Sequence, residues 1–209
     1  MAGVFITFEG IDGCGKTTQV QRVYDTLLSA GMDVIRLREP GGTRISEAIR
    51  AVLLDKDNAE MCDECELLLY EASRAQMVKQ VVEPALAAGT IVLCDRFYDS
   101  TFAYQAGGRG INAQRVQAAN KLGSCGVDPT RTLILDIDPR EGFARATKGG
   151  ADRLEAEGLM FQTAVRKGYL TVAQENPQRA QLVNASGSPD EVYQRICDAL
   201  SDLIPQLGA

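Results

Sequence analysis

Short apolar runs alternate along the chain with longer segments in which apolar side chains recur every three or four residues. The short runs are rich in β-branched residues and predict buried strands at 4–8, 33–37, 90–94, 132–137 and 181–184. The longer segments predict amphipathic helices at 16–29, 43–54, 63–86, 112–122, 159–174 and 190–203. We expect the segment 63–86 to bend or break near Pro84, because proline cannot supply the backbone hydrogen bond of a helix interior.

This alternation of strands and helices predicts an α/β fold built from βαβ units. Such units form a parallel sheet, here of five strands, with helices on both faces. Ligands bind these sheets outside the carboxyl ends of the strands, so functional residues are expected just after each strand. No linker-like stretch and no internal repeat interrupts the pattern, and we expect residues 1–209 to form a single domain.

The composition narrows the class of protein. Of the 209 residues, 45% are hydrophobic and 24% are charged, and the formal net charge of -6 argues against a broad nucleic-acid-binding surface. The chain has no histidine, which excludes imidazole bases, Ser-His hydrolase chemistry and His-ligated zinc. Cys62 and Cys65 form a close pair, but a structural zinc site would need a second such pair. No apolar run reaches the ~18 residues of a membrane span, so we expect a cytoplasmic protein with reduced thiols.

The segment from Gly10 to Thr17 fits the phosphate-loop pattern G-x-x-x-x-G-K-[ST]. It lies between the first strand and the first helix, which is the context that this motif requires. The glycines let successive backbone N–H groups turn inward, and the helix N-terminus adds the positive end of a dipole. Lys16 brings a charge to the β- and γ-phosphates, and Thr17 offers its hydroxyl to Mg2+. We expect a nucleoside triphosphate to bind at Gly10, Asp12, Gly13, Cys14, Gly15, Lys16, Thr17 and Thr18.

A carboxylate that serves the metal ion is expected where a buried strand ends. Asp95 follows the strand at 90–94, and we assign it to Mg2+. Arg96 comes next and would face a phosphate-bearing substrate above the sheet. Asp136 and Asp138 are competing carboxylates, and their alternative role is to cap the helix that begins at Pro139.

Several segments, taken in their order and spacing, resemble thymidylate kinases over nearly the whole chain. They are Phe8–Gly10 with the phosphate loop, Arg38–Thr43, Ser73–Gln76, Asp95–Phe97, Ser100–Gln105, Leu135–Pro139 and Asp152–Glu155. The resemblance implies a P-loop NTPase fold with a mobile lid. It also implies a homodimer that, with Mg2+, transfers the γ-phosphoryl group of ATP to dTMP, giving dTDP and ADP in the dTTP biosynthesis pathway.

The same resemblance implies an acceptor site for dTMP. Asp12 matches the acid that binds the 3′-hydroxyl, while Arg50 and Arg96 match the residues that hold the acceptor phosphate. The base and the deoxyribose would be recognised by Tyr70, Arg74, Ser100, Tyr104 and Gln105. Within this set Tyr104 fits the ring that crowds the sugar 2′ position. Ser100 and Gln105 fall where the family reads the edge of the base.

Tyr70 and Arg74 also have a case from spacing alone. They lie at i and i+4 of a predicted helix, so they share one face and can grip a single planar ligand. The family commonly carries phenylalanine where Tyr70 stands. The alternative roles are core packing for Tyr70 and, for Arg74, a surface ion pair with Glu71 or Asp63.

The catalytic cations are divided between the loop and a lid. Some thymidylate kinases carry an arginine directly after the phosphate-loop carboxylate, where this chain has Gly13. The chain therefore resembles the group whose lid, here about 145–155, supplies the cation. Arg153 is favoured for the γ-phosphate and Arg145 is next, and the alternative is a charged loop without a catalytic part. The predicted catalytic set is Lys16, Arg96, Arg145 and Arg153.

Two other functions compete with this one. A deoxynucleoside kinase of the same fold would have no 5′-phosphate for Arg50 and Arg96 to hold. A switch protein that only hydrolyses its nucleotide would need neither of these arginines nor a cationic lid. A GTPase would read guanine with an N-K-x-D segment, and the nearest match, at 120–123, lacks the aspartate.

Overall fold

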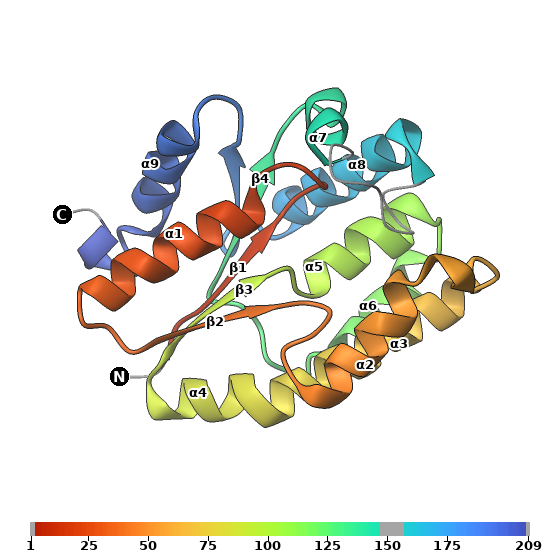
Figure 1. Cartoon of the computed structure of the whole chain (residues 1–209), viewed down its shortest axis with the longest axis horizontal. Coiled ribbons are helices and arrows are strands. Elements are labelled where there is room, and N and C mark those ends of the chain that lie inside the picture. Colours follow the sequence, from red (N-terminus) through yellow and green to blue (C-terminus); the bar gives the residue numbers. More distant parts are fainter. Residues whose placement is uncertain (1–2, 147–156, 208–209) are drawn as a thin grey trace.

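The computed structural model describes residues 3–146 and 157–207. All strands of its five-stranded sheet are parallel, in the order β2-β3-β1-β4-β5 (Figure 1). The strands are β1 (Phe5–Glu9), β2 (Val34–Arg38), β3 (Ile91–Asp95), β4 (Arg131–Asp136) and β5 (Ala180–Asn184). Each lies within one residue of its predicted position at either end, and the predicted α/β fold is confirmed.

Helices cover both faces of the sheet. In Figure 1, α1 and α9 lie together on one face, and α4 lies on the opposite face. The α-helices are α1 (Lys16–Ser29), α2 (Arg44–Leu54), α3 (Asp63–Met77), α4 (Glu83–Ala88), α5 (Tyr98–Thr101), α6 (Ala113–Gly123), α7 (Pro139–Ala146), α8 (Leu159–Glu175) and α9 (Pro189–Leu200). Two π-helical segments, η2 (Val78–Val82) and η3 (Phe102–Gly108), and two short 3-10 turns, η1 (Lys56–Asn58) and η6 (Pro205–Leu207), complete the described elements. None of the helices in these residue ranges combines the length and apolar character that crossing a membrane requires.

The central strand β1 contributes side chains to two separate apolar clusters. Ile6 and Phe8 belong to the cluster that includes Val23 of α1. Phe5 belongs to the cluster that includes Val82 of η2. Alternate residues of a strand point to opposite faces, so β1 is buried on both sides and its last residues are held rigidly at the carboxyl edge of the sheet.

The predicted interruption of the segment 63–86 is present as the π-helical turn η2, which ends at Val82, two residues before Pro84. Pro84 has no N–H for the carbonyl four residues earlier, and its ring crowds that carbonyl, so the helix widens before the proline instead of breaking at it.

The apolar periodicity did not predict the helical stretch formed by α5 and η3. Its buried residues include the polar side chains Asp99, Thr101 and Gln105. A helix whose buried face is polar lacks the apolar repeat from which amphipathic helices are recognised. This stretch matters because it packs against α8 and lines the functional cavity.

We expect the substitution Gly168→Ala in α8 to lower the free energy of unfolding by about 1–3 kcal/mol, as overpacked sites do. A Cβ atom at Gly168 would lie 2.7 Å from the Cα atom of Ala103 in η3, so one of the two helices must move. Urea titration followed by circular dichroism measures the change. The matched control is Lys167→Ala, at an exposed position of the same helix. Equal midpoints for the two variants would contradict the close contact.

Candidate active site

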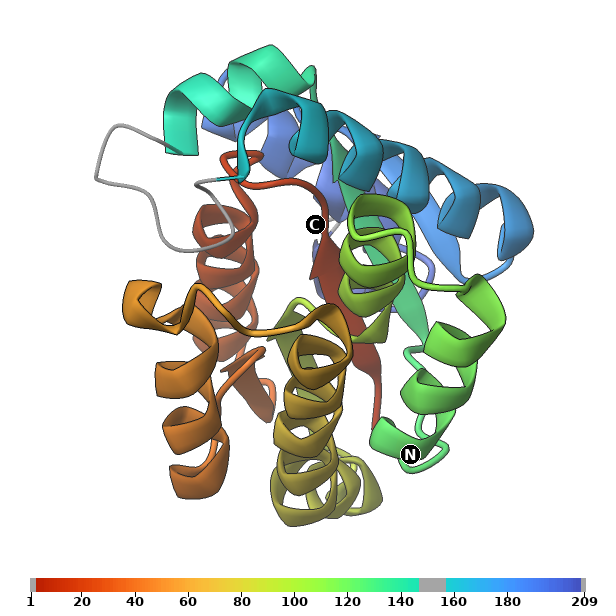
Figure 2. The same ribbon diagram turned by 90° about the vertical axis from the view of Figure 1, so that its right-hand side faces the viewer.

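A cavity of about 620 Å³ opens at the carboxyl edge of the sheet. Residues of α1, α2, α3, η3 and α7 line it. Figure 2 shows how these elements are arranged around the ends of the strands. The predicted residues that line it are Asp12, Gly13, Gly15, Lys16, Thr17, Thr18, Arg50, Tyr70, Arg74, Asp95, Arg96, Ser100, Tyr104 and Gln105. Of the predicted residues that the structure describes, Gly10, Cys14 and Arg145 do not line it. Segments far apart in the sequence thus converge on one site.

The phosphate loop encloses its own lysine. Gly10 and Gly15 have φ angles of 134° and 93°, a region that favours glycine, and they turn the backbone around the Lys16 side chain. The buried Nζ of Lys16 donates hydrogen bonds to the carbonyl oxygens of Gly10 (3.0 Å) and Ile11 (2.9 Å). The side chain of Cys14 is buried in the larger apolar cluster, so this residue offers a nucleotide only its backbone.

The competing carboxylates have distinct partners. The Thr17 hydroxyl donates to Asp95 Oδ2 at 2.5 Å, which brings the loop hydroxyl and the strand-end carboxylate together. Asp136 accepts two hydrogen bonds from Arg166, at 2.6 and 2.8 Å. Asp138 accepts from the backbone N–H of Arg140 at 2.8 Å, in the first turn of α7, which is the capping role that the sequence left open. Asp95 is therefore the carboxylate placed beside the phosphate loop.

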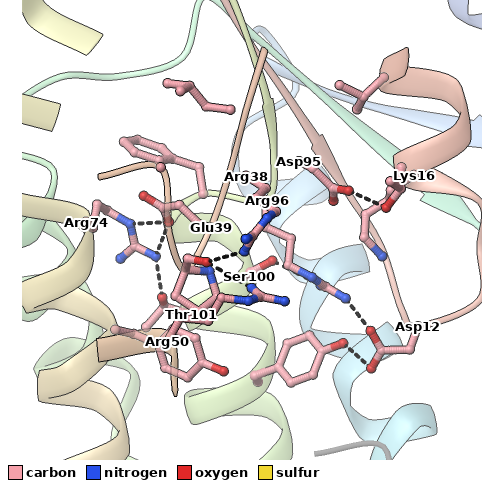
Figure 3. A pocket seen from close by; sticks show the side chains of 18 of the residues that line it. Asp12, Lys16, Arg38, Glu39, Arg50, Arg74, Asp95, Arg96, Ser100 and Thr101 are labelled. Carbon is pink, nitrogen blue, oxygen red and sulfur yellow. Dashed lines mark hydrogen bonds and ion pairs between the residues drawn. The ribbon is translucent and has the colours of Figure 1, made fainter. Parts of the chain in front are cut away.

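Arg96 has an unusual backbone conformation that its neighbours hold in place. Its φ angle is 75°, in the left-handed region that residues other than glycine seldom adopt. Its N–H donates to the Phe8 carbonyl oxygen at 2.9 Å, and the next N–H, of Phe97, donates to Glu9 Oε1 at 2.7 Å. This backbone turns the guanidinium toward the loop, where it forms an ion pair with Asp12 (Figure 3).

The Asp12 carboxylate is surrounded by donors. Besides Arg96, it accepts hydrogen bonds from the Tyr104 hydroxyl at 2.8 Å and from Gln162 Nε2 at 2.9 Å. Burial by itself would raise the pKa of Asp12, but the charges of Arg96 and Lys16 and these hydrogen bonds hold its pKa below the ordinary value. Asp12 is therefore a fixed anion at the mouth of the loop.

The alternative for Arg74 was a surface ion pair with Glu71 or Asp63: the pair with Glu71 is present, but its surface location is wrong, because only 1% of Arg74 is exposed. Its guanidinium donates to Glu39 Oε2 and to Thr101 Oγ1, both at 2.8 Å (Figure 3). It also forms an ion pair with Glu71. Burial raises the pKa of Glu39 to about 7, against the opposing effect of Arg74. The surface location was wrong because Glu39, which follows β2 and is distant in sequence, contacts Arg74 within the fold.

Two further arginines that line the cavity meet at one backbone oxygen. Nη1 of Arg50 donates to the Pro40 carbonyl oxygen at 2.8 Å, and Nη1 of Arg38 donates to the same oxygen at 3.1 Å. Tyr70, on α3, is half-buried, packs against the larger apolar cluster and lines the cavity. The site therefore has several cations on one side and an aromatic ring that a planar ligand can contact.

Sequence reasoning missed four residues that shape the site. Glu9 accepts from Ser100 Oγ (2.5 Å) and from the Tyr169 hydroxyl (3.1 Å). Glu39 binds Arg74, and Gln162 binds Asp12. Two features of the sequence could have identified these four residues as candidates for the site. Glu9 and Glu39 are acids at the ends of strands, and residues 162 and 169 are seven apart, on one face of a helix.

The predicted lid lies mostly outside the described residues. Arg145, in the last turn of α7, forms an ion pair with Glu141, whereas Arg153 and the rest of 147–156 are not described. The contact between α7 and the phosphate loop is close, because a Cβ atom at Gly13 would lie 2.0 Å from the carbonyl oxygen of Gly142. With α7 in this position, residue 13 has no room for any side chain.

We expect Glu9→Gln to flatten part of the pH dependence of stability. Burial, and then the charge of Asp99, raise the pKa of Glu9 from 4.5 to about 7. Between these values the folded protein keeps a proton that the unfolded chain has lost, so this residue's contribution to stability falls as the pH rises from about 5 to about 7.

The expected effect is that the fall in unfolding free energy between pH 5 and pH 7.5 is about 2 kcal/mol smaller in Glu9→Gln than in the wild type. Urea titrations at the two pH values measure it. Glu60→Gln, at an exposed position, is the control. An identical pH dependence in Glu9→Gln and the wild type would show that Glu9 is ionised throughout.

Comparison with known proteins agrees with this geometry. The sequence model of the family described as thymidylate kinase matches residues 8–196. The chain is 44% identical to a thymidylate kinase of Nitratidesulfovibrio vulgaris, over 96% of this chain and 97% of that protein. It is 50% identical to a thymidylate kinase of Desulforudis audaxviator, over 88% of this chain and 84% of the relative.

A solved structure is similar over the same extent. The crystal structure of a thymidylate kinase from Ehrlichia chaffeensis superimposes with a TM-score of 0.78 and 32% sequence identity, and the match covers 96% of this chain and 100% of the other. Sequence, fold and site geometry lead to the same conclusion: the chain belongs to the thymidylate kinase family.

Proposed function

We propose that the protein transfers the γ-phosphoryl group of ATP to dTMP, giving dTDP and ADP, in the dTTP biosynthesis pathway. The observation that carries the proposal is that one cavity is lined both by the phosphate loop and by Arg50, Arg74 and Arg96 with Tyr70. A protein that only hydrolyses a nucleotide has no use for this second set of residues. Its cations and its aromatic ring suit an acceptor that has both a phosphate and a planar base.

The transfer itself needs positioning and charge neutralisation. The backbone N–H groups of the loop and Lys16 hold the donor phosphates, while Arg50 and Arg96 hold the acceptor phosphate in line with them. An oxygen of the acceptor phosphate attacks the γ-phosphorus, and the bond between that phosphorus and the bridging oxygen of ADP breaks. The attacking oxygen is already anionic at neutral pH, so the site requires no strong general base.

Mg2+ fits the donor set of this site. Thr17 Oγ1 and Asp95 Oδ2 lie 2.5 Å apart, and a hydroxyl beside a carboxylate is a typical pair of protein ligands for this ion. Together with nucleotide oxygens and water they would hold Mg2+, which neutralises charge on the β- and γ-phosphates.

The remaining acceptor roles that we propose are those implied by the resemblance to the family, and the side chains that would fill them line the same cavity. We assign stacking on thymine to Tyr70, hydrogen bonds to the base to Arg74, Ser100 and Gln105, and the 3′-hydroxyl to Asp12. We assign to the Tyr104 ring, whose hydroxyl binds Asp12, the role of crowding a 2′-hydroxyl, which would favour deoxyribose.

A homodimer is also part of the proposal. The segment 67–82 is a candidate for the dimer surface because it is rich in apolar residues, but its residues Leu67, Val78 and Val82 are buried within the subunit. Leu68 of α3 and Leu122 of α6 are 64% and 79% exposed, and these two helices contact each other. The proposed interface is therefore an α3–α6 surface. Sedimentation equilibrium decides between monomer and dimer.

We propose further that residues 1–209 act as one nucleoside monophosphate kinase domain located in the cytoplasm. All six cysteines are free, which suits a reducing compartment. Limited proteolysis tests the single domain, because stable fragments would indicate separate units. Cell fractionation tests the location.

A panel of acceptors tests the reaction. We expect ADP release in a coupled assay to be fast with dTMP and at least about 100-fold slower with dCMP, dGMP and AMP, because a site built to bind one base leaves its polar groups unpaired with another. Lys16→Ala, which removes the charge from the phosphate loop, is the inactive control. Equal rates with all acceptors, or no rate with dTMP, would exclude the proposed function.

Arg153→Ala and Arg96→Ala should differ in their kinetics. If Arg153 contacts the transferring group, its loss lowers kcat by a factor of about 100 or more while KM for dTMP changes little. Loss of Arg96, which we assign to the acceptor phosphate, should also raise KM for dTMP. Arg145→Ala is the matched lid control, and a larger loss of kcat in that variant would move the catalytic role to Arg145.

A further inference from the structure

Gln105, which lines the cavity, is held from behind by a buried acid. Its Nε2 donates a hydrogen bond to Glu66 Oε1 at 2.9 Å. Both residues are 1% exposed, so water does not compete for this contact. Glu66 lies in the first turn of α3, and Gln105 lies in η3, so the bond joins two elements that line the site.

Arg109 fixes Glu66 as a hydrogen-bond acceptor. Its Nε and Nη2 donate to the two oxygens of Glu66, each at 3.2 Å. Arg109 is itself held by Glu157 at 2.5 Å, and its guanidinium lies over the Phe161 ring, 4.9 Å from the centroid. A carboxylate that is paired in this way only accepts hydrogen bonds.

The side-chain amide of Gln105 consequently has one favourable orientation. With Nε2 toward Glu66, the amide forms a hydrogen bond. After a 180° flip, Oε1 would face the carboxylate, and two acceptors would lie against each other in a buried site. In the favoured orientation, Oε1 is the amide atom turned away from Glu66. Because Gln105 lines the cavity, this oxygen can accept a hydrogen bond from a ligand there.

We propose that Glu66 is a positioning residue that sets the base specificity of the acceptor site: it fixes the amide of Gln105 with its oxygen toward the base, and so selects a pyrimidine with a hydrogen at N3 over cytosine. The proposal rests on the proposed function, because it assumes that Gln105 meets the edge of the base.

The chemistry of the two pyrimidines explains the selection. Thymine and uracil present a donor at N3 and an acceptor at O4, and these match the oxygen of Gln105 and the guanidinium donors of Arg74. Cytosine presents an acceptor at N3 and an amino group at C4. A freely rotating Gln105 could turn Nε2 toward the cytosine N3, and Glu66 prevents that rotation. Glu66 therefore acts mainly by excluding the wrong base.

Two substitutions release the amide in different ways. In Glu66→Gln, the new side chain can donate or accept, so either orientation of Gln105 finds a partner. In Glu66→Asp, the negative charge beside Arg109 remains, but the shorter side chain no longer reaches Gln105. For both variants we expect the ratio of kcat/KM for dTMP to kcat/KM for dCMP to fall by about 10-fold or more, while KM for ATP is unchanged.

A residue swap separates positioning from general support of the fold. In the double variant Glu66→Gln with Gln105→Glu, the new carboxylate at 105 accepts from the amide at 66 and still turns an oxygen toward the base. The selectivity for dTMP over dCMP should therefore return toward the wild-type ratio. If Glu66→Gln lowered the selectivity only by weakening the fold, the second substitution would not restore the ratio. Glu64→Gln, the same chemical change at an exposed position of α3, is the control and should leave the ratio unaltered.

The outcomes distinguish this inference from the function on which it rests. If the wild-type protein does not prefer dTMP to dCMP, the proposed function fails first. If the wild type prefers dTMP, and both single variants keep its ratio within twofold, only the role of Glu66 is overturned. If Glu66→Gln does not fold, the selectivity of Glu66→Asp and of the double variant still tests the role of Glu66. A double variant as unselective as the single ones overturns the inference as well.

Discussion

The ion pair between Arg96 and Asp12 is the contact on which the rest of the site depends. It joins the end of β3 to the phosphate loop across the carboxyl edge of the sheet, and it requires a left-handed backbone at Arg96. The Phe8 carbonyl and the Glu9 carboxylate hold that backbone from β1, so the most buried strand sets the direction of the guanidinium. Tyr104 binds the same Asp12 and ties η3 to the loop. The donor and acceptor halves of the cavity are thus parts of one network.

The network buries charged side chains, and their removal from water costs desolvation free energy. Arg74 lies between Glu39 and Glu71, so a single guanidinium serves two buried carboxylates. Such a group adds little to stability, since desolvation offsets much of the attraction, but removal of one partner leaves an uncompensated charge. The two carboxylates orient the guanidinium of Arg74 in advance. Its hydrogen-bond donors therefore need not reorganise when a substrate binds or when the phosphoryl group is transferred. The raised pKa values of Glu9 and Glu39 are signs of this cost.

Whether the sequence could predict a residue's role depended on whether that role belongs to a local pattern. Lys16 has a role that a strand, a loop and a helix define within a few residues, and spacing alone located it. Arg74 looks the same in sequence as an arginine in a surface ion pair, and only Glu39, from a distant segment, makes it buried. Glu66 resembles the acids that favour any helix N-terminus. Its contact with Gln105 joins residues 39 positions apart, and no local periodicity records such a contact.

The contact between Gly13 and Gly142 also limits how this enzyme can evolve. A relative that carries its catalytic arginine in the phosphate loop needs a side chain at position 13, which in this chain would collide with the backbone of α7. The change at position 13 is therefore tolerated only after α7 has moved, and a moved α7 leaves a gap until that side chain is present. Substitutions at contacting positions of this kind are not additive. Position 13 and the placement of α7 are therefore expected to change together, because a side chain at position 13 fits only when the backbone at Gly142 lies farther away.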